Sequence, residues 1–121
     1  MEYPISEIVD RLSIVWLKVH RIGGEQFDEE CRRLESAKAE YESRTKLNFE
    51  KEFLLLHEVN GKIWDLEADI RQGKEDKLGL EEVGRRALLI RGFNKFRIEI
   101  KNRVAAMAGG FEEVKKDHAS E

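Results

Sequence analysis

The chain has 121 residues, the size of one domain, of which 40% are hydrophobic and 39% charged, and its net charge is −3. Its single cysteine, Cys31, excludes an intramolecular disulfide and a cysteine-based metal site, and it fits a reducing, cytoplasmic compartment. The acidic balance argues against nucleic acid as a partner, and the short apolar runs argue against a membrane-spanning helix.

The first predicted helix spans about residues 5–22. Its apolar stripe repeats at spacings of three and four, through Ile5, Ile8, Leu12, Val15, Val19 and Ile22. Ser6 is the expected N-cap, and the glycine pair at 23–24 is the expected end. Ile14 and Leu17 lie on another side, which predicts two neighbours or an oligomer partner for this helix.

The second predicted helix spans about residues 26–46, and the third about 49–72. The stripe of the second helix is thin, because alanines and Lys38 interrupt the larger residues, and this is typical of a peripheral helix. Asn48 is the expected N-cap of the third helix and Gly73 its expected C-cap. No proline or glycine separates the two helices, so a continuous helix through Asn48 is an alternative interpretation.

The segment "GKEDKLG", residues 73–79, is predicted to be a loop, and the fourth helix is predicted over about 80–108. Its main stripe consists of Leu89, Phe93, Phe96, Ile100, Val104 and Met107. Gly84 and Gly92 inside it each cost about 1 kcal/mol against alanine, which favours a close helix approach or a bend.

These elements predict an all-α fold of four mostly antiparallel helices, arranged as a bundle or a long coiled-coil hairpin. Residues 1–108 form the single expected domain, and residues 109–121 a short appendage docked by Phe111 and Val114. The expected oligomer is a homodimer through helix 1 or helices 2 and 3.

Two polar residues interrupt the apolar face of the third helix. Asn60 and Glu67, one heptad apart, share the arc of the residues expected to be buried. A buried carboxylate needs a cation or a metal, so Glu67 either has such a partner or points into solvent. Asn60 alone also fits a device that fixes the register of a coiled coil.

The fourth helix offers cations for this face. Asn94, Arg97 and Lys101 project together, and Asp10 or Arg21 of the first helix is expected near the edge. The predicted polar site therefore lies between the third and fourth helices. It serves either as a structural ion network or as a site for a ligand carrying phosphate or carboxylate.

No cofactor is expected, and magnesium is the alternative. Glu7 and Asp10 are three residues apart, and Asp65 and Asp69 are four apart, so each pair shares a helix face. All-helical nucleotide pyrophosphatases hold magnesium with carboxylate pairs of this kind. The second pair, in "DLEAD", does not match their E-x-x-D pattern.

Other chemistry is not expected. His20, His57 and His118 form no H-x-x-x-H pair, so zinc is not predicted. Cys31 lies on an apolar stripe and is interpreted as a small core residue. "FNKFRIEIKNR", residues 93–103, mixes aromatic and basic residues, but its phenylalanines are assigned to the core stripe and not to RNA stacking.

Three blocks resemble an uncharacterised bacterial helical family, a domain of unknown function found alone or beside glycan- and capsule-related modules. They are "SEIVDRLSIVWLKVHRI", "EVNGKIWDLEADIR" and "NKFRIEIKNRV". The middle block matches the family pattern N-x-x-[LI]-W-x-[LI]-E-x-x-I-R, and the residues that match are Asn60, Trp64, Glu67 and Arg71. Asp10 and Lys18 look like matches in the first block, and Asn94, Arg97 and Lys101 in the last.

The chain departs from that family in having a longer segment between the first two blocks and no attached domain. The resemblance implies that the polar helix positions are not accidental, and it implies no activity. The expected function is a non-enzymatic, oligomeric binding or scaffold module whose polar site takes an anionic ligand. The alternative is an enzyme, a magnesium-dependent nucleotide pyrophosphohydrolase.

Overall fold

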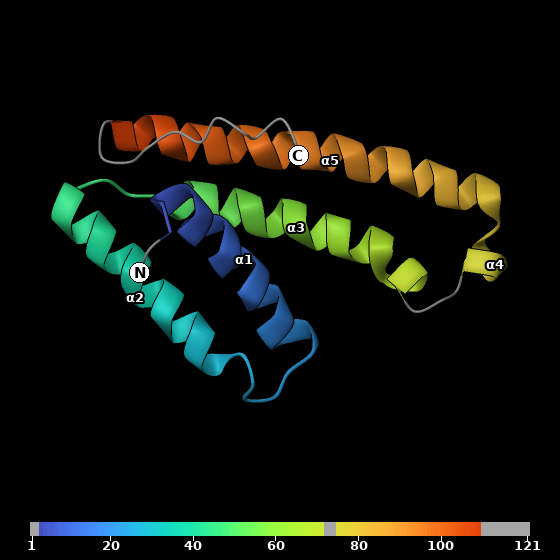
Figure 1. Cartoon of the computed structure of the whole chain (residues 1–121), viewed down its shortest axis with the longest axis horizontal. Coiled ribbons are helices and arrows are strands. Elements are labelled where there is room, and N and C mark those ends of the chain that lie inside the picture. Colours follow the sequence, from blue (N-terminus) through green and yellow to red (C-terminus); the bar gives the residue numbers. More distant parts are fainter. Residues whose placement is uncertain (1–2, 72–74, 110–121) are drawn as a thin grey trace.

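The computed structural model describes residues 3–71 and 75–109, apart from the side chains of residues 71, 75 and 76. This part of the chain is all-α, as predicted, with four long helices and one single-turn helix. Their bounds are α1 Ile5–Arg21, α2 Asp28–Thr45, α3 Glu50–Arg71, α4 Glu75–Leu78 and α5 Leu80–Ala108. The antiparallel helices α3 and α5 form a long hairpin, and the α1–α2 pair packs against one part of it (Figure 1).

The long helices begin and end within two residues of the predicted bounds. The segment at 73–79 was wrongly predicted to be a loop throughout, because it contains α4. Gly79 separates α4 from α5 with a φ of +80°, a conformation that side-chain-bearing residues rarely adopt. The expected docking of Phe111 and Val114 lies outside the described residues.

The start of α1 corrects one expectation. Pro4, not Ser6, is the N-cap residue, and its carbonyl accepts hydrogen bonds from Glu7 and Ile8 N–H at 3.0 Å each. Proline suits this position because it has no N–H to leave unpaired and its φ is already fixed. At the other end Gly23 adopts a φ of +82° and donates to the Lys18 carbonyl at 3.2 Å, as expected of a glycine stop.

The break between α2 and α3 shows that the continuous-helix interpretation is wrong. Lys46 ends α2 in the left-handed region with a φ of +64°. The Glu42 carboxylate then accepts a hydrogen bond from Phe49 N–H at 2.7 Å, and Asn48 Oδ1 accepts one from Glu50 N–H at 3.0 Å. The side chain of Asn48 thus caps the start of α3 as expected, but from one position earlier than predicted, because Phe49 directly precedes the helix.

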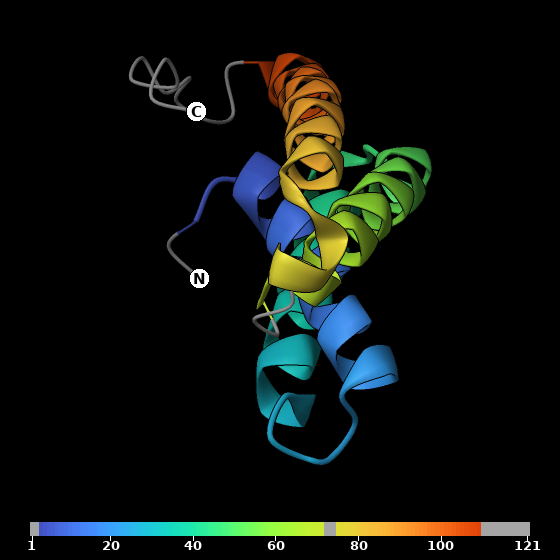
Figure 2. The same cartoon turned by 90° about the vertical axis from the view of Figure 1, so that its right-hand side faces the viewer.

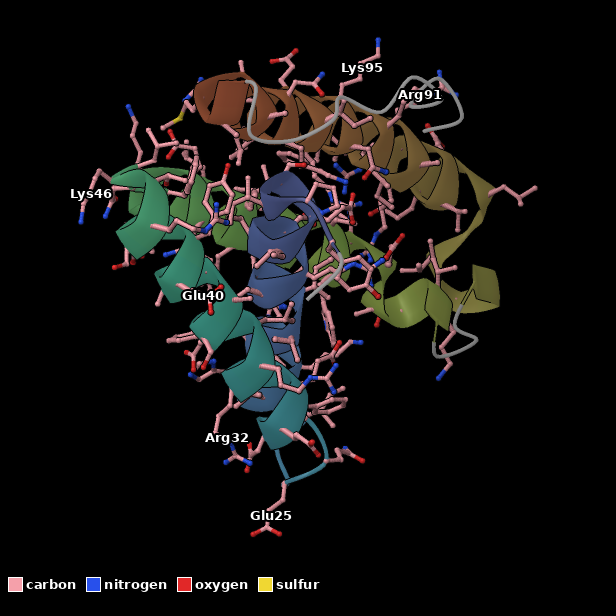
Figure 3. All side chains as sticks on the ribbon, turned by 60° about the vertical axis from the view of Figure 1, so that its left-hand side comes forward. Glu25, Arg32, Glu40, Lys46, Arg91 and Lys95 are labelled. Carbon is pink, nitrogen blue, oxygen red and sulfur yellow. The ribbon has the colours of Figure 1, made fainter. Side chains whose placement is uncertain are left out.

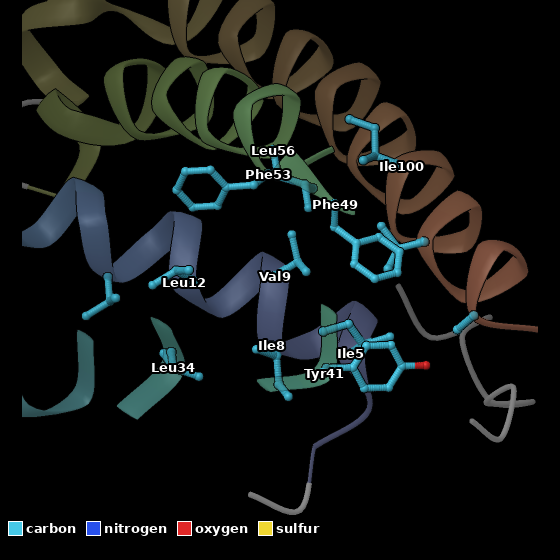
Figure 4. Packing of buried hydrophobic residues seen from close by; sticks show 13 residues of the cluster. Ile5, Ile8, Val9, Leu12, Leu34, Tyr41, Phe49, Phe53, Leu56 and Ile100 are labelled. Carbon is cyan, nitrogen blue, oxygen red and sulfur yellow. The ribbon is translucent and has the colours of Figure 1, made fainter. Parts of the chain in front are cut away.

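The core lies around α1, which has α2 on one side and α3 and α5 on the other (Figures 2 and 4). Leu17, which was assigned to a second side of this helix, is buried as well. By contrast, α2 buries only Leu34, Lys38 and Tyr41, in agreement with its thin stripe. The apolar cluster includes Ile5, Ile8, Val9, Leu12, Val15, Phe49, Phe53, Leu56, Ile100 and Val104.

The stripe of α5 is only partly covered. Ile100 and Val104 are buried, but Leu89, Phe96 and Met107 are 39%, 42% and 38% exposed. The assignment of Phe96 to the core is therefore wrong, because the neighbouring helices cover Ile100 on the same stripe but leave Phe96 exposed. None of the helices in the described ranges has the length and apolar character needed to cross a membrane.

Candidate functional site

A buried carboxylate holds the molecule's main polar cluster together. Asp10 of α1 is 1% exposed and accepts two hydrogen bonds from Arg97 of α5, from Nε at 3.1 Å and from Nη2 at 2.6 Å. The fork of the guanidinium thus meets both carboxylate oxygens, the strongest arrangement for this pair. The sequence predicted Arg97 in such a cluster, but it placed Asp10 at the edge and not at the centre.

The third helix joins through an amide. Asn60 Nδ2 donates to Asp10 Oδ1 at 3.1 Å and to Ser13 Oγ at 2.9 Å. Ser13 is fully buried, and its hydroxyl donates to the Asp10 carbonyl at 2.6 Å. Sequence reasoning missed Ser13, although its position three residues after Asp10 in an apolar stretch was the available signal.

Lys101 supplies the second cation. It is 7% exposed, and its Nζ donates to Glu7 Oε1 at 2.6 Å and lies 3.8 Å from Asp10 Oδ2. Glu7 also pairs with Arg11 on the surface, at 3.4 Å. Six residues therefore form the buried polar cluster: Glu7, Asp10, Ser13, Asn60, Arg97 and Lys101.

The charges in this cluster cancel. Glu7 and Asp10 carry two negative charges, and Arg97 and Lys101 carry two positive ones. A neighbouring cavity of about 240 Å³ is lined by Asn94, Arg97, Ile98 and Lys101. A small anion entering that cavity would have to compete with two carboxylates already bound to the same cations.

Glu67 does not take the place expected for it. It is half-buried, and its neighbour Leu66 accepts a hydrogen bond through its carbonyl from Arg86 Nη1 at 3.2 Å. Arg86 lies eleven residues before Arg97, about 16 Å along α5 at 1.5 Å per residue. Glu67 therefore lies at the level of Arg86, away from the cations that the sequence predicted as its partners.

The remaining predicted site residues are dispersed. Trp64 is half-buried, with the Arg21 guanidinium 5.9 Å from its ring centre, and Asn94 is half-buried beside the small cavity. Arg71 is the last residue of α3, and its side chain lies outside the described residues. The structure thus brings Asp10, Asn60, Arg97 and Lys101 together, but not Glu67.

The carboxylates of the magnesium alternative do not converge. Asp65 pairs with Arg21, and Asp69 lies 3.7 Å from Arg86. Arg21 is eleven residues, or about 16 Å, beyond Asp10 along α1. In residues 3–71 and 75–109 no group of three or more His, Cys, Asp or Glu side chains is placed to hold a metal ion. Glu7, Asp10, Asp65 and Asp69 therefore do not form the single magnesium site that the alternative requires.

A second buried cation links α2 to α3. Lys38, 9% exposed, places its Nζ 3.2 Å from both Glu42 and Glu50. Cys31 is half-buried against the apolar cluster, as expected. Burial, followed by the nearby Glu35 carboxylate, raises the pKa of the Cys31 thiol, which makes it a weak nucleophile.

Both tryptophan rings contact other side chains of the protein. Trp16 Nε1 donates to Glu35 at 3.2 Å, and its ring meets Phe53 edge-on at 5.8 Å. Neither ring is arranged as an open platform for a sugar or a base.

Comparisons of the chain with protein-family models, with curated proteins and with solved structures find no match. The resemblance to an uncharacterised bacterial family therefore stays a prediction, and the function has to be inferred from the molecule's own geometry.

Proposed function

We propose that the protein is a non-enzymatic helical scaffold that forms a homodimer through α5. The observation that carries this proposal is a line of exposed apolar side chains on that helix, the outer stripe, made of Leu89, Phe96 and Met107. Their spacings of seven and eleven residues are close to two and three helical turns, so they lie on one line, which is interrupted by the buried Ile100 between Phe96 and Met107. The single cysteine, Cys31, is half-buried and free, which fits a protein of the cytoplasm.

The outer stripe has the features of a helix-pairing surface. Leu89 and Phe96 are one heptad apart, and the charged Arg103 occupies the next heptad position before Met107. Exposed large apolar side chains that share one side of a helix are a surface that a second copy of the chain can cover. The sequence placed the dimer contact on helix 1 or helices 2 and 3. We place it on α5 because α1 is enclosed by α2, α3 and α5.

The buried polar cluster supports the scaffold side of this proposal. Its two carboxylates and two cations satisfy one another and come from the first and last long helices, with Asn60 joining from α3. Balanced, desolvated charges specify how three helices fit together, which is the task of a structural network.

The test is the mass of the protein in solution. Light scattering after gel filtration should give a dimer for the wild type and a monomer for Leu89→Glu with Phe96→Glu. Leu54→Glu is the matched control, because Leu54 is 56% exposed on α3 and lies outside the outer stripe. A wild type that stays monomeric at high micromolar concentration, or a control that also loses the dimer, would contradict the proposal.

A second candidate function is the binding of a small phosphate- or carboxylate-bearing ligand in the cavity beside Arg97 and Lys101. The melting temperature should then rise with inorganic phosphate, nucleotides or sugar nucleotides, and Asn94→Ala should reduce the rise. No shift with any of them at millimolar concentration would remove this candidate and leave the scaffold.

A further inference from the structure

A second and larger hollow lies on the other side of α1. A groove of about 600 Å³ runs between the start of α1 and the outward side of α2. An adjoining cavity of about 210 Å³ shares Tyr3 and Arg33 with the groove and adds Arg11. The groove alone is within the range of about 300–1,000 Å³ that is usual for ligand sites in proteins.

Three arginines line this groove, and the ion pairs of the described residues do not use them. Arg32, Arg33 and Arg44 all project from α2, and among residues 3–71 and 75–109 none of them has a carboxylate oxygen within 4.0 Å. This differs from the buried polar cluster, where each cation already holds a carboxylate. The groove therefore has guanidinium groups available for an incoming anion.

An aromatic residue of the groove helps to position one of these cations. Arg44 lies over the ring of Tyr41 at 5.0 Å; in the adjoining cavity Arg11, which already pairs with Glu7, lies over the ring of Tyr3 at 4.1 Å. Stacking of this kind holds a guanidinium plane while its N–H edge stays free to meet a carboxylate. Ile5, Ile8 and Ala37 add an apolar floor between the charged ends.

The length of the groove restricts its occupant. Arg32 and Arg44 are twelve residues apart on one helix, about 18 Å at 1.5 Å per residue. No single phosphate group bridges that distance, whereas an extended peptide of five or six residues does, at about 3.3 Å per residue.

The order of charges restricts the occupant further. Glu29 and Glu40 also line the groove, so negative and positive groups alternate along α2; Figure 3 shows Arg32 and Glu40 along its outer side. A uniformly charged polyphosphate would be repelled at the glutamates. A peptide with acidic residues near its two ends and uncharged residues between them avoids that repulsion.

We infer that the groove binds an extended segment of a partner protein that carries two acidic residues about five positions apart, with apolar side chains between them. The acidic residues pair with Arg32 or Arg33 at one end and with Arg44 at the other. The apolar side chains rest on Ile5, Ile8 and Ala37. This site does not involve the outer stripe of α5, so it stands or falls independently of the dimer.

Fluorescence anisotropy with a defined probe tests this inference. The probe is a labelled pool of short peptides with glutamate fixed five positions apart and leucine, phenylalanine, serine or alanine between. The full-length protein should bind the pool saturably, and a pool with glutamine in place of glutamate should bind far less. Since charge-assisted hydrogen bonds are the stronger ones, Arg33→Gln with Arg44→Gln should weaken binding by about tenfold or more.

A matched control removes two positive charges elsewhere. Arg91→Gln with Lys95→Gln lowers the net charge equally, and both residues project from the outer side of α5 (Figure 3). This variant should bind the glutamate pool like the wild type. Absence of saturable binding, equal binding of the two pools, or unchanged binding by the Arg33/Arg44 variant with native helix content would each overturn the inference.

Discussion

Arg97 of α5 donates hydrogen bonds to both carboxylate oxygens of Asp10 of α1, from Nε at 3.1 Å and from Nη2 at 2.6 Å. The carboxylate is 2% exposed and the guanidinium side chain 30% exposed, so one partner of the pair is fully desolvated. Removing one partner of such a pair destabilises the fold strongly, because the other charge stays buried without a counter-ion.

Replacing Asp10 by alanine should lower the free energy of unfolding by roughly 3–5 kcal/mol, the range for breaking a buried ion pair. The loss arises because Arg97 and Lys101 keep their positive charges without the central carboxylate. Urea denaturation followed by circular dichroism measures it. Asp65→Ala is the control, because its pair with Arg21 is exposed and should be worth less than about 1 kcal/mol. A loss as small as the control's for Asp10→Ala would show that the cluster does not hold the helices.

The amide of Asn60 should be the next most sensitive position. Asn60→Ala removes the donor that joins Asp10 and Ser13, and it should cost about 1–3 kcal/mol because buried acceptors lose their partner. Ser13→Ala should cost less, since the Ser13 hydroxyl donates only to the backbone carbonyl of Asp10, and the Asp10 carboxylate keeps Asn60 and Arg97 as donors. The same urea titrations rank the variants. Asn102→Ala, on the exposed side of α5, should leave stability unchanged.

Gly84 is predicted to lower the stability of α5 without being needed for packing. A Cβ built at Gly84 meets nothing within 4 Å, so neither a close helix approach nor a bend requires glycine there. Gly84→Ala should raise stability by roughly 0.5–1 kcal/mol, the cost of glycine inside a helix. Gly79→Ala should instead destabilise by roughly 1–3 kcal/mol, because its positive φ strains a residue with a side chain. The melting temperatures of both variants test this prediction. A change of the same sign and size in the two variants would contradict it.

Stability should fall on the acid side of neutrality because of His57. Burial, then the charges of His20 and Arg21, lower the pKa of His57 below its ordinary value of 6.5. The unfolded chain therefore binds a proton that the folded chain resists, so folding loses stability as pH falls through 6.5 toward the lower folded pKa. Unfolding titrations from neutral to mildly acidic pH should show this loss, and His57→Gln should reduce it. A His57 midpoint at or above 6.5 by NMR would exclude this cause.

Helical periodicity predicted much of the fold because it depends only on neighbours within one helix. The stripe of α1 and the glycine stop at Gly23 follow from local spacing and backbone freedom. The same reasoning found Asn60, Arg97 and Lys101 as polar residues on faces that the fold does enclose.

The partners across helices could not be predicted in the same way. Whether Arg97 meets Glu67 or Asp10 depends on the axial offset between α3 and α5 and on which side of α1 they cover. Neither quantity is set by the spacing inside one helix. Phe96 was misplaced for a related reason, since periodicity marks an apolar side but not how much of it a neighbour covers.

The arginine groove was also missed at the sequence level. Arg32, Arg33 and Arg44 read as an ordinary solvated side of a peripheral helix, and only the start of α1 turns that side into one wall of a hollow. The available signal was that Arg33 and Arg44, eleven residues apart, share a side of α2.

The contact between Asp10 and Arg97 spans 87 positions of the chain. During synthesis the first helix therefore emerges with a carboxylate in its apolar stripe. Its counter-ion, Arg97, is made only after most of the polypeptide has been synthesised. Nascent or truncated chains that stop short of position 97 lack the closing element, so assembly should be all-or-none and slow compared with the local α3–α5 hairpin.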